Sequence, residues 1–198
     1  MRTSVIVFPG SNCDRDVKVA IERITKKPVK MVWHGDASVP QSDLIVLPGG
    51  FSYGDYLRCG AMAAHSAVMR DVIAKAKAGV PVLGICNGFQ ILCESGLLPG
   101  VLRANHHGRF NCLEAGLVVE RDSPWAGHRP VGETIRIPVK HGEGAWYVPG
   151  SVAISVPDGD STYMASLRLP YYLVASCCMN WRTSASTSPP SAACKQHS

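Results

Sequence analysis

The chain has 198 residues, of which 46% are hydrophobic and 18% are charged, and its formal net charge at pH 7 is +5. This apolar content is enough for the core of one domain, or of two small ones, and it excludes a chain that is disordered throughout. Acidic and basic residues are interleaved over the first 160 positions, so the mild positive charge forms no basic stripe and we expect no nucleic-acid partner.

Short apolar segments alternate with segments of helical periodicity in the first half of the chain. The apolar segments predict buried strands at residues 5–8, 29–33, 44–47 and 80–85. Apolar residues at helical spacing predict helices at residues 17–24, 61–78 and 87–95. The first of these helices is expected to be capped near Asn12 or Asp14 and to carry Ile24 in its apolar stripe.

This alternation of continuously apolar strands with helices predicts a parallel sheet that is covered on both faces. The fold class is therefore α/β, a doubly wound and mostly parallel sheet, with the functional site at the carboxyl ends of the strands. From about residue 110 to residue 139 the pattern changes to short strands at 117–119 and 134–137, which we expect to form a small antiparallel addition to the sheet.

The composition changes near residue 149. Residues 161–198 contain no Asp or Glu, and residues 183–198 consist mainly of Ser, Ala and Pro, with little that could pack. We therefore expect a folded domain over residues 1–150 and a separate C-terminal segment over residues 151–198, which is partly a disordered tail.

Eight cysteines are scattered along the chain. None of them forms a Cys-x-x-Cys pair with another, so we expect no metal site. The sequence has no apolar run long enough for a membrane span and no signal peptide. These features predict a cytoplasmic protein with reduced thiols and no membrane partner.

The sequence GICNG at residues 84–88 follows a predicted strand and opens a predicted helix. Glycines on both sides of a nucleophile allow a sharp turn, which lifts the nucleophile above the sheet. The N-terminus of the following helix stabilises the thiolate of Cys86. The alternative is a buried structural cysteine, because unpaired cysteines are often buried. The setting between strand and helix favours a catalytic nucleophile.

A second glycine-rich turn, PGGFSYGD at residues 48–55, ends the neighbouring predicted strand at the same edge of the sheet. Its glycines allow main-chain N–H groups to point into the site. Gly50 and Phe51 are therefore predicted to form an oxyanion hole together with Asn87. The alternative is an ordinary turn or a phosphate-binding turn. The nearby Cys86 favours acyl transfer.

Three motifs carry a resemblance to a known family: PGSNCD at residues 9–14, PGGFSYGDYLR at 48–58 and GICNGFQ at 84–90. Together they resemble the class I glutamine amidotransferases, which have a flavodoxin-like fold, and in particular the glutamine amidotransferase subunits of phosphoribosylformylglycinamidine synthases. Further residues that resemble this family lie at 33–36, 96–100, 105, 110–112, 136–139 and 141–144.

The resemblance implies that Cys86 attacks the side-chain amide of glutamine, releases ammonia and forms a thioester that water hydrolyses to glutamate. It also implies that Gly49, Gly50, Gln90 and His141 contact the bound glutamine. In this family the ammonia passes to a large synthetase subunit, which converts formylglycinamide ribonucleotide to the amidine in purine synthesis. A small third subunit bridges the two. The chain itself then needs no cofactor, while ATP and magnesium belong to the synthetase.

The sequence departs from the family in its last quarter. The family takes its general base from a His-Pro-Glu motif, which this sequence lacks. His197 is the last histidine, no acidic residue follows Asp160, and His141 is the least implausible substitute base. Two interpretations stay open: an enzyme, or a docking subunit that no longer hydrolyses glutamine. The C-terminal segment is either native or the product of an altered reading frame.

Overall fold

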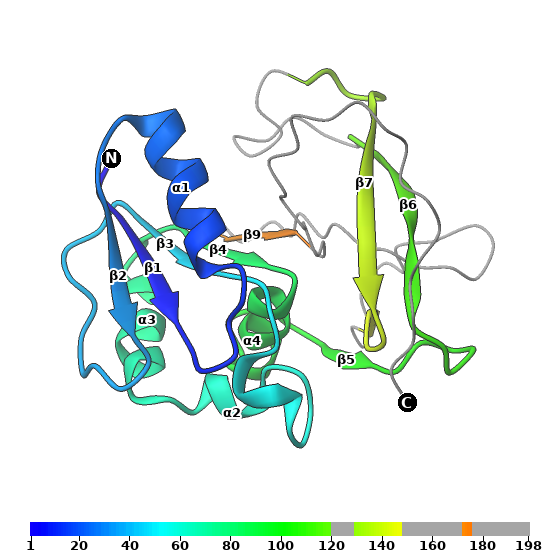
Figure 1. Cartoon of the computed structure of the whole chain (residues 1–198), viewed down its shortest axis with the longest axis horizontal. Coiled ribbons are helices and arrows are strands. Elements are labelled where there is room, and N and C mark those ends of the chain that lie inside the picture. The colour runs from blue at the N-terminus through cyan, green and yellow to red at the C-terminus, as the bar shows by residue number, and fades with distance from the viewer. Residues whose placement is uncertain (120–128, 148–171, 176–198) are drawn as a thin grey trace.

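The computed structural model describes residues 1–119, 129–147 and 172–175. Its main body is built on a five-stranded sheet in the order β2-β1-β3-β4-β9, in which every neighbouring pair is parallel (Figure 1). The strands are β1 (Thr3–Val7), β2 (Val29–Trp33), β3 (Leu44–Leu47), β4 (Val82–Ile85) and β9 (Tyr172–Ala175). The first four lie where the sequence predicts strands.

The helices of the described residues differ from the predicted ones in three details. They are α1 (Asp14–Thr25), α2 (Ala61–Ala64), α3 (Ala67–Lys77) and α4 (Asn87–Glu94), and a tight turn, η1, covers Ser52–Asp55. The single helix predicted over residues 61–78 is wrong, because the backbone is extended at Ser66, with ψ at 157°. Cys13, and not Asn12 or Asp14, is the N-cap of α1. Ile24 is 81% exposed, so it lies outside the packed stripe of that helix.

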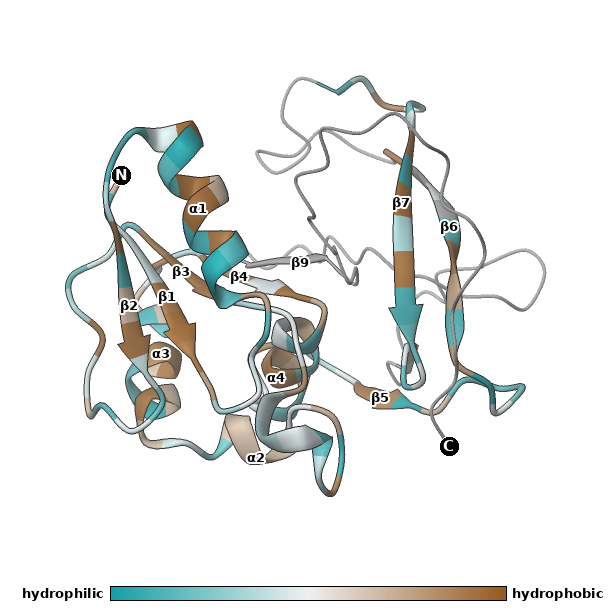
Figure 2. Cartoon of the chain, in the orientation of Figure 1, coloured by the Kyte–Doolittle hydropathy of each residue, from teal (hydrophilic) through white to brown (hydrophobic). Residues whose placement is uncertain are grey.

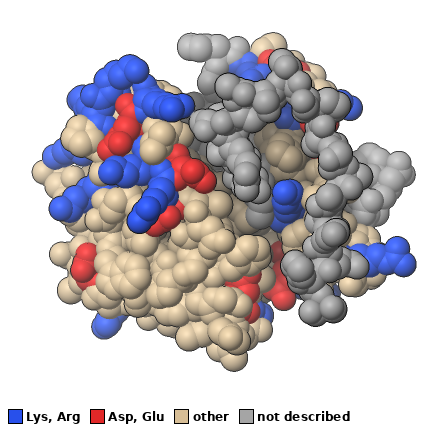
Figure 3. All heavy atoms as spheres, in the orientation of Figure 1, with Lys and Arg blue, Asp and Glu red and all other residues tan. Residues whose placement is uncertain are grey.

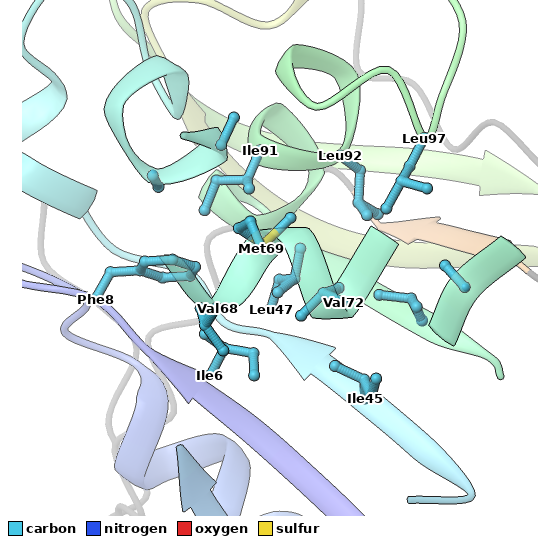
Figure 4. Close-up of a cluster of buried hydrophobic side chains, with 14 of the residues drawn as sticks. Ile6, Phe8, Ile45, Leu47, Val68, Met69, Val72, Ile91, Leu92 and Leu97 are labelled. Atoms are coloured by element: carbon cyan, nitrogen blue, oxygen red, sulfur yellow. The ribbon is translucent and has the colours of Figure 1, made fainter. Parts of the chain in front are cut away.

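Side chains of the strands alternate between two apolar clusters, one on each face of the sheet. On one face, Val17 and Ile21 of α1 pack against strand residues such as Val46. On the other face, Ile45 and Leu47 of β3 contribute to the larger cluster, which is filled by side chains of α2, α3 and α4 (Figure 4). Helices therefore cover both faces, and the predicted doubly wound α/β class is confirmed.

Two antiparallel strand pairs follow α4 in the described residues. β5 (Val101–Arg103) pairs with β8 (Ala145–Tyr147), and β6 (Asn111–Val118) pairs with β7 (Thr134–His141). We call β6 and β7 the ribbon. It contains the predicted strands, but it forms a sheet of its own beside the main body instead of an addition to the main sheet (Figure 1). Leu102 and Trp146 of the β5–β8 pair pack against the larger cluster, so this pair attaches the ribbon to the body.

Strand β9 lies within residues 151–198, the segment that the sequence analysis separates from the domain, and it pairs with β4. The rest of that segment, including the tail predicted at 183–198, lies outside the described residues. Among the helices that the structure describes, none is long and apolar enough to span a membrane.

Candidate active site

Cys86 lies between the last residue of β4 and the first residue of α4, at the predicted turn. Its φ of 51° and ψ of −108° place it in a region that residues with a side chain rarely adopt. Close packing on both sides explains the flanking glycines: a Cβ on Gly88 would lie 2.0 Å from the Leu47 carbonyl oxygen, and one on Gly84 would lie 2.5 Å from a Leu92 methyl group. The cysteine is thus held in a strained turn, as a nucleophile between strand and helix is.

The N-terminus of α4 begins directly after this cysteine. The amides of Phe89 and Gln90 both donate to the Cys86 carbonyl oxygen, at 2.9 and 3.3 Å. The amides of Asn87 and Gly88 come first in the helix and have no carbonyl of a preceding turn to bond. These two N–H groups and the helix dipole favour negative charge beside Cys86.

The turn after β3 brings Gly49 next to Cys86. A Cβ on Gly49 would lie 3.4 Å from the Cys86 Cβ and 3.6 Å from the Cys13 sulfur. Gly50 has a φ of 130°, and a Cβ there would lie 2.4 Å from the Asn12 amide nitrogen. A residue with a side chain therefore does not fit at Gly50, and the main chain of this turn can approach a substrate held by Cys86.

Phe51 differs from its predicted role. Its N–H donates to the Gly10 carbonyl oxygen at 2.9 Å, so in this conformation the loop itself uses the amide that was predicted to face an oxyanion. The roles of Gly50 and Asn87 as oxyanion donors stay predictions, and the Phe51 N–H is engaged with Gly10. The bond forms because the turns after β1 and β3 lie side by side at the edge of the sheet.

The buried side chain of Asn87 connects the start of α4 with the turn η1. Its Oδ1 accepts from the Ser52 N–H at 3.1 Å, and its Nδ2 donates to Asp55 Oδ1 at 3.1 Å and to Gln90 Oε1 at 2.9 Å. Gln90 in turn donates from Nε2 to the Glu143 carbonyl oxygen at 3.2 Å. Both ends of the Gln90 amide are thus engaged with the protein, while one proton and one lone pair remain for a substrate.

Acidic groups and a second thiol lie beside this network. The Cys59 N–H donates to Glu143 Oε2 at 3.4 Å. Burial raises the pKa of the Asp55 carboxyl. Burial and the nearby carboxylates of Asp55 and Glu143 raise the pKa of the Cys59 thiol and favour its protonated form. The sequence analysis assigned no role to these three residues.

His141, at the end of β7, is buried and organises the turn that follows it. Asn105 Nδ2 donates to the carbonyl oxygens of Arg109 and His141, and its Oδ1 accepts from the Gly144 N–H. His141 Nδ1 lies 3.0 Å from the same Oδ1 and therefore carries the proton that is donated to it. Burial, with a smaller effect of His107, lowers the pKa of His141 and favours its neutral form.

The geometry of His141 does not test its predicted contact with glutamine, which stays a prediction. Its Nε2 is buried and, among the described residues, has no hydrogen-bond partner. The ring packs so closely on Gly144 that a Cβ there would lie 2.1 Å from Nδ1. Asn105 is one of the further positions that resemble the family, but no sequence pattern indicates its bonds, because His141 and Gly144 lie 36 and 39 positions away in the chain.

Comparison with known proteins gives consistent matches. The family model of the CobB/CobQ-like glutamine amidotransferase domain matches residues 1–157. Subunit PurQ of phosphoribosylformylglycinamidine synthase from Trichormus variabilis is 48% identical over 159 residues, which are 80% of this chain and 71% of that protein. The corresponding subunit from Rubrobacter xylanophilus is 52% identical over 155 residues, or 77% of this chain and 70% of that protein.

Solved structures give the same result. A chain in the structure of PurLQS from Thermotoga maritima is 44% identical, with a TM-score of 0.65 over 74% of this chain and 69% of that chain. A protein from Thermoplasma acidophilum that is named as a GMP synthase subunit has a TM-score of 0.51 at 18% identity, over 72% of this chain and 66% of that one, and shares the fold.

Proposed function

Because the chain belongs to the family of CobB/CobQ-like glutamine amidotransferase domains, we propose that it hydrolyses glutamine to glutamate and ammonia. The observation that carries this proposal is the strained Cys86, which lies between the main chain of Gly49 and the N-terminus of α4. A sulfur nucleophile flanked by main-chain N–H donors is what acyl transfer from an amide requires.

The reaction begins when the Cys86 thiolate attacks the side-chain amide carbon of glutamine. The negative oxygen that forms is stabilised by main-chain N–H groups of Gly50 and Asn87. The C–N bond then breaks, the nitrogen takes up a proton, and ammonia leaves a thioester. Water attacks the thioester, which releases glutamate and returns the thiol.

The proposal includes a partner that consumes the ammonia. The similar proteins are named as subunits of phosphoribosylformylglycinamidine synthase, and the similar solved structure is of PurLQS. On this support, a large synthetase subunit with bound ATP and magnesium uses the ammonia to convert formylglycinamide ribonucleotide to the amidine in purine synthesis. A small subunit bridges the two, and the complex works in the cytoplasm, where thiols stay reduced.

The loop that leaves the active site has a surface suited to such a partner. Tyr56 is 72% exposed and Leu57 is 87% exposed, and Leu57 has a φ of 72°. An exposed leucine in left-handed backbone contributes little to the fold. Figure 3 shows few charged residues around η1 and α2, at the bottom of the view, whereas Lys and Arg gather over α1. The exposed side chains of Phe51, Tyr56 and Leu57 give this loop an apolar surface, which fits a subunit that receives the ammonia.

Binding to the purified synthetase tests this surface. Leu57→Ser is expected to weaken the binding at least about tenfold, while Ile24→Ser, which replaces an equally exposed residue of α1, leaves it unchanged. Equal binding of both variants would remove the loop from the proposed interface.

Residues 1–198 contain no His-Pro-Glu motif, so a second candidate stays open: a subunit that docks on the synthetase but does not turn over glutamine. Without a base, a nucleophile can form the thioester but deacylates slowly. The two candidates share Cys86 and the fold, and they differ in steady-state release of ammonia.

One experiment separates the two candidates. Ammonia release from glutamine is measured with and without the synthetase, beside Cys86→Ala and, as a matched control, Cys112→Ala on the exposed ribbon. The enzyme is expected to lose at least about a thousandfold in activity in Cys86→Ala and none in Cys112→Ala. Labelling of Cys86 by a glutamine-shaped chloroketone without turnover would indicate the docking subunit. If the chain shows no labelling and no turnover, the proposed glutaminase site is refuted.

A further inference from the structure

We propose that the side chain of Asn87 is the positioning residue that sets the distance between the nucleophile and the glycine turn. The inference rests on the proposed glutaminase function. Asn87 is 1% exposed and directly follows Cys86 in the chain. The sequence analysis gives a role to its main-chain N–H alone; its side chain has a separate one.

The bonds of Asn87 require an amide. Its Oδ1 accepts from the Ser52 N–H, so its Nδ2 faces Asp55 and Gln90 and donates to an oxygen of each. An aspartate could still accept from Ser52, but its second oxygen would face the oxygens of Asp55 and Gln90. A leucine fills a similar volume and bonds none of the three. Asparagine is therefore the residue that satisfies all three neighbours.

These bonds link three segments that are distant in the sequence. Ser52 lies two residues after Gly50, so its bond to Asn87 ties the turn after β3 to the nucleophile. The Asn87–Gln90 bond orients the Gln90 amide, and Nε2 of Gln90 then reaches the carbonyl oxygen of Glu143. We call this chain of bonds the Asn87 relay. It joins η1, the first turn of α4 and residues 141–144.

The relay matters because the Asn87–Ser52 bond joins the turn after β3 to the start of α4, whereas the bonds from Phe51 N–H to Gly10 and from Tyr53 N–H to Pro9 join it to the turn after β1. Glycines 49 and 50 have no side chains to pack, and η1 contains Tyr53 and Asp55 at positive φ. A displacement of about 1 Å between a nucleophile and the groups around it can cost about a hundredfold in rate. Asn87 thus acts on the reaction through the turn, without contact of its side chain with the reacting atoms.

Labelling kinetics of Cys86 test this role without the need for turnover. A glutamine-shaped chloroketone places its carbonyl oxygen where the oxyanion forms, whereas iodoacetamide alkylates the thiol without such a site. In Asn87→Leu and Asn87→Asp, we expect the maximal labelling rate by the chloroketone to fall about 30-fold. The rate with iodoacetamide should change less than about threefold, which loss of structure alone would not produce.

Two further variants keep the test decisive. Asp55→Ser removes one acceptor of the relay at a half-buried position, keeps the Ser52 bond and is expected to give an intermediate loss, about fivefold. Asn111→Leu replaces a buried asparagine of β6 outside the relay and is expected to leave the ratio of the two labelling rates unchanged.

Each outcome has a distinct meaning. If chloroketone and iodoacetamide rates change in parallel in the Asn87 and Asp55 variants, or stay as in the unsubstituted chain, the positioning role is wrong. If the chloroketone does not label the unsubstituted chain at all, the proposed glutaminase site is wrong. The proposed role of the relay is then wrong as well, because it rests on that site.

Discussion

The turn at Cys86 and the turn at residues 141–144 come from regions that are built in opposite ways. In the main body, strand residues such as Ile6, Ile45 and Leu47 are completely buried, and β3 is apolar along its length (Figure 2). Along β7 of the ribbon, exposed side chains alternate with partly buried ones, and complete burial is reached at Val139 and nearly so at His141. The buried residues of β7 therefore lie at its C-terminal end, which approaches the site.

This difference shows how each part of the site is held. Cys86 keeps a strained backbone because close packing of Gly84 and Gly88 leaves the chain no other path. The 141–144 turn depends on hydrogen bonds to Asn105 and on the ring of His141. Changes in packing should damage the first part, and changes in hydrogen bonding or protonation should damage the second.

The largest effect is expected from Gly88→Ala. Alanine normally stabilises a helix by about 1 kcal/mol relative to glycine, but the new Cβ would lie 2.0 Å from the main-chain oxygen of Leu47. We expect the clash to dominate and to lower the free energy of unfolding by at least about 3 kcal/mol. Gly116→Ala on β6 meets a Thr134 methyl group at 3.3 Å and should change stability by less than about 0.5 kcal/mol. Equal losses in urea denaturation would contradict the comparison.

A smaller and more local effect is expected from Asn105→Ala. The change removes four hydrogen bonds, three of them buried, and we expect a loss of about 2 kcal/mol in the free energy of unfolding. Hydrogen exchange should accelerate at the Gly144 amide and not at the Phe89 amide of α4. Asn105→Asp keeps both bonds that Oδ1 accepts and, by its charge, should raise the pKa of His141 in an NMR titration. Unchanged exchange at Gly144 would show that the turn has another support.

The smallest effect concerns pH. Burial lowers the pKa of His141 below 6.5, so the folded chain binds fewer protons at this site than the unfolded chain. The free energy of unfolding should therefore fall as the pH drops below about 6.5, which is the pKa of His141 in the unfolded chain. The fall should end once the pH is below the pKa of His141 in the folded chain. In His141→Asn this part of the dependence should disappear in urea denaturations between pH 7 and 5. A pH dependence identical to that of the unsubstituted chain would show that His141 does not titrate as its burial implies.

Local patterns predicted the fold and the tight turn at Cys86 well. Apolar runs locate β1 to β4, and the glycines around Cys86 indicate a turn whose tight packing the structure confirms. The break of the 61–78 helix at Ser66 was missed, because apolar periodicity continues through it while the backbone does not. The exposure of Ile24 was missed for a related reason: spacing marks a helix face but not how much of that face the sheet covers.

The sequence by itself determined the alternation of strands and helices and the residue at the turn, because both depend on neighbours a few positions apart. The tertiary structure alone decided what surrounds that residue. The Asn87 amide meets Ser52 across 35 positions of the chain, and Gln90 meets Glu143 across 53. Such contacts follow from the order of the strands and the path of the ribbon, which no local pattern encodes. They are also the contacts that turn a reactive cysteine into a site with a defined shape.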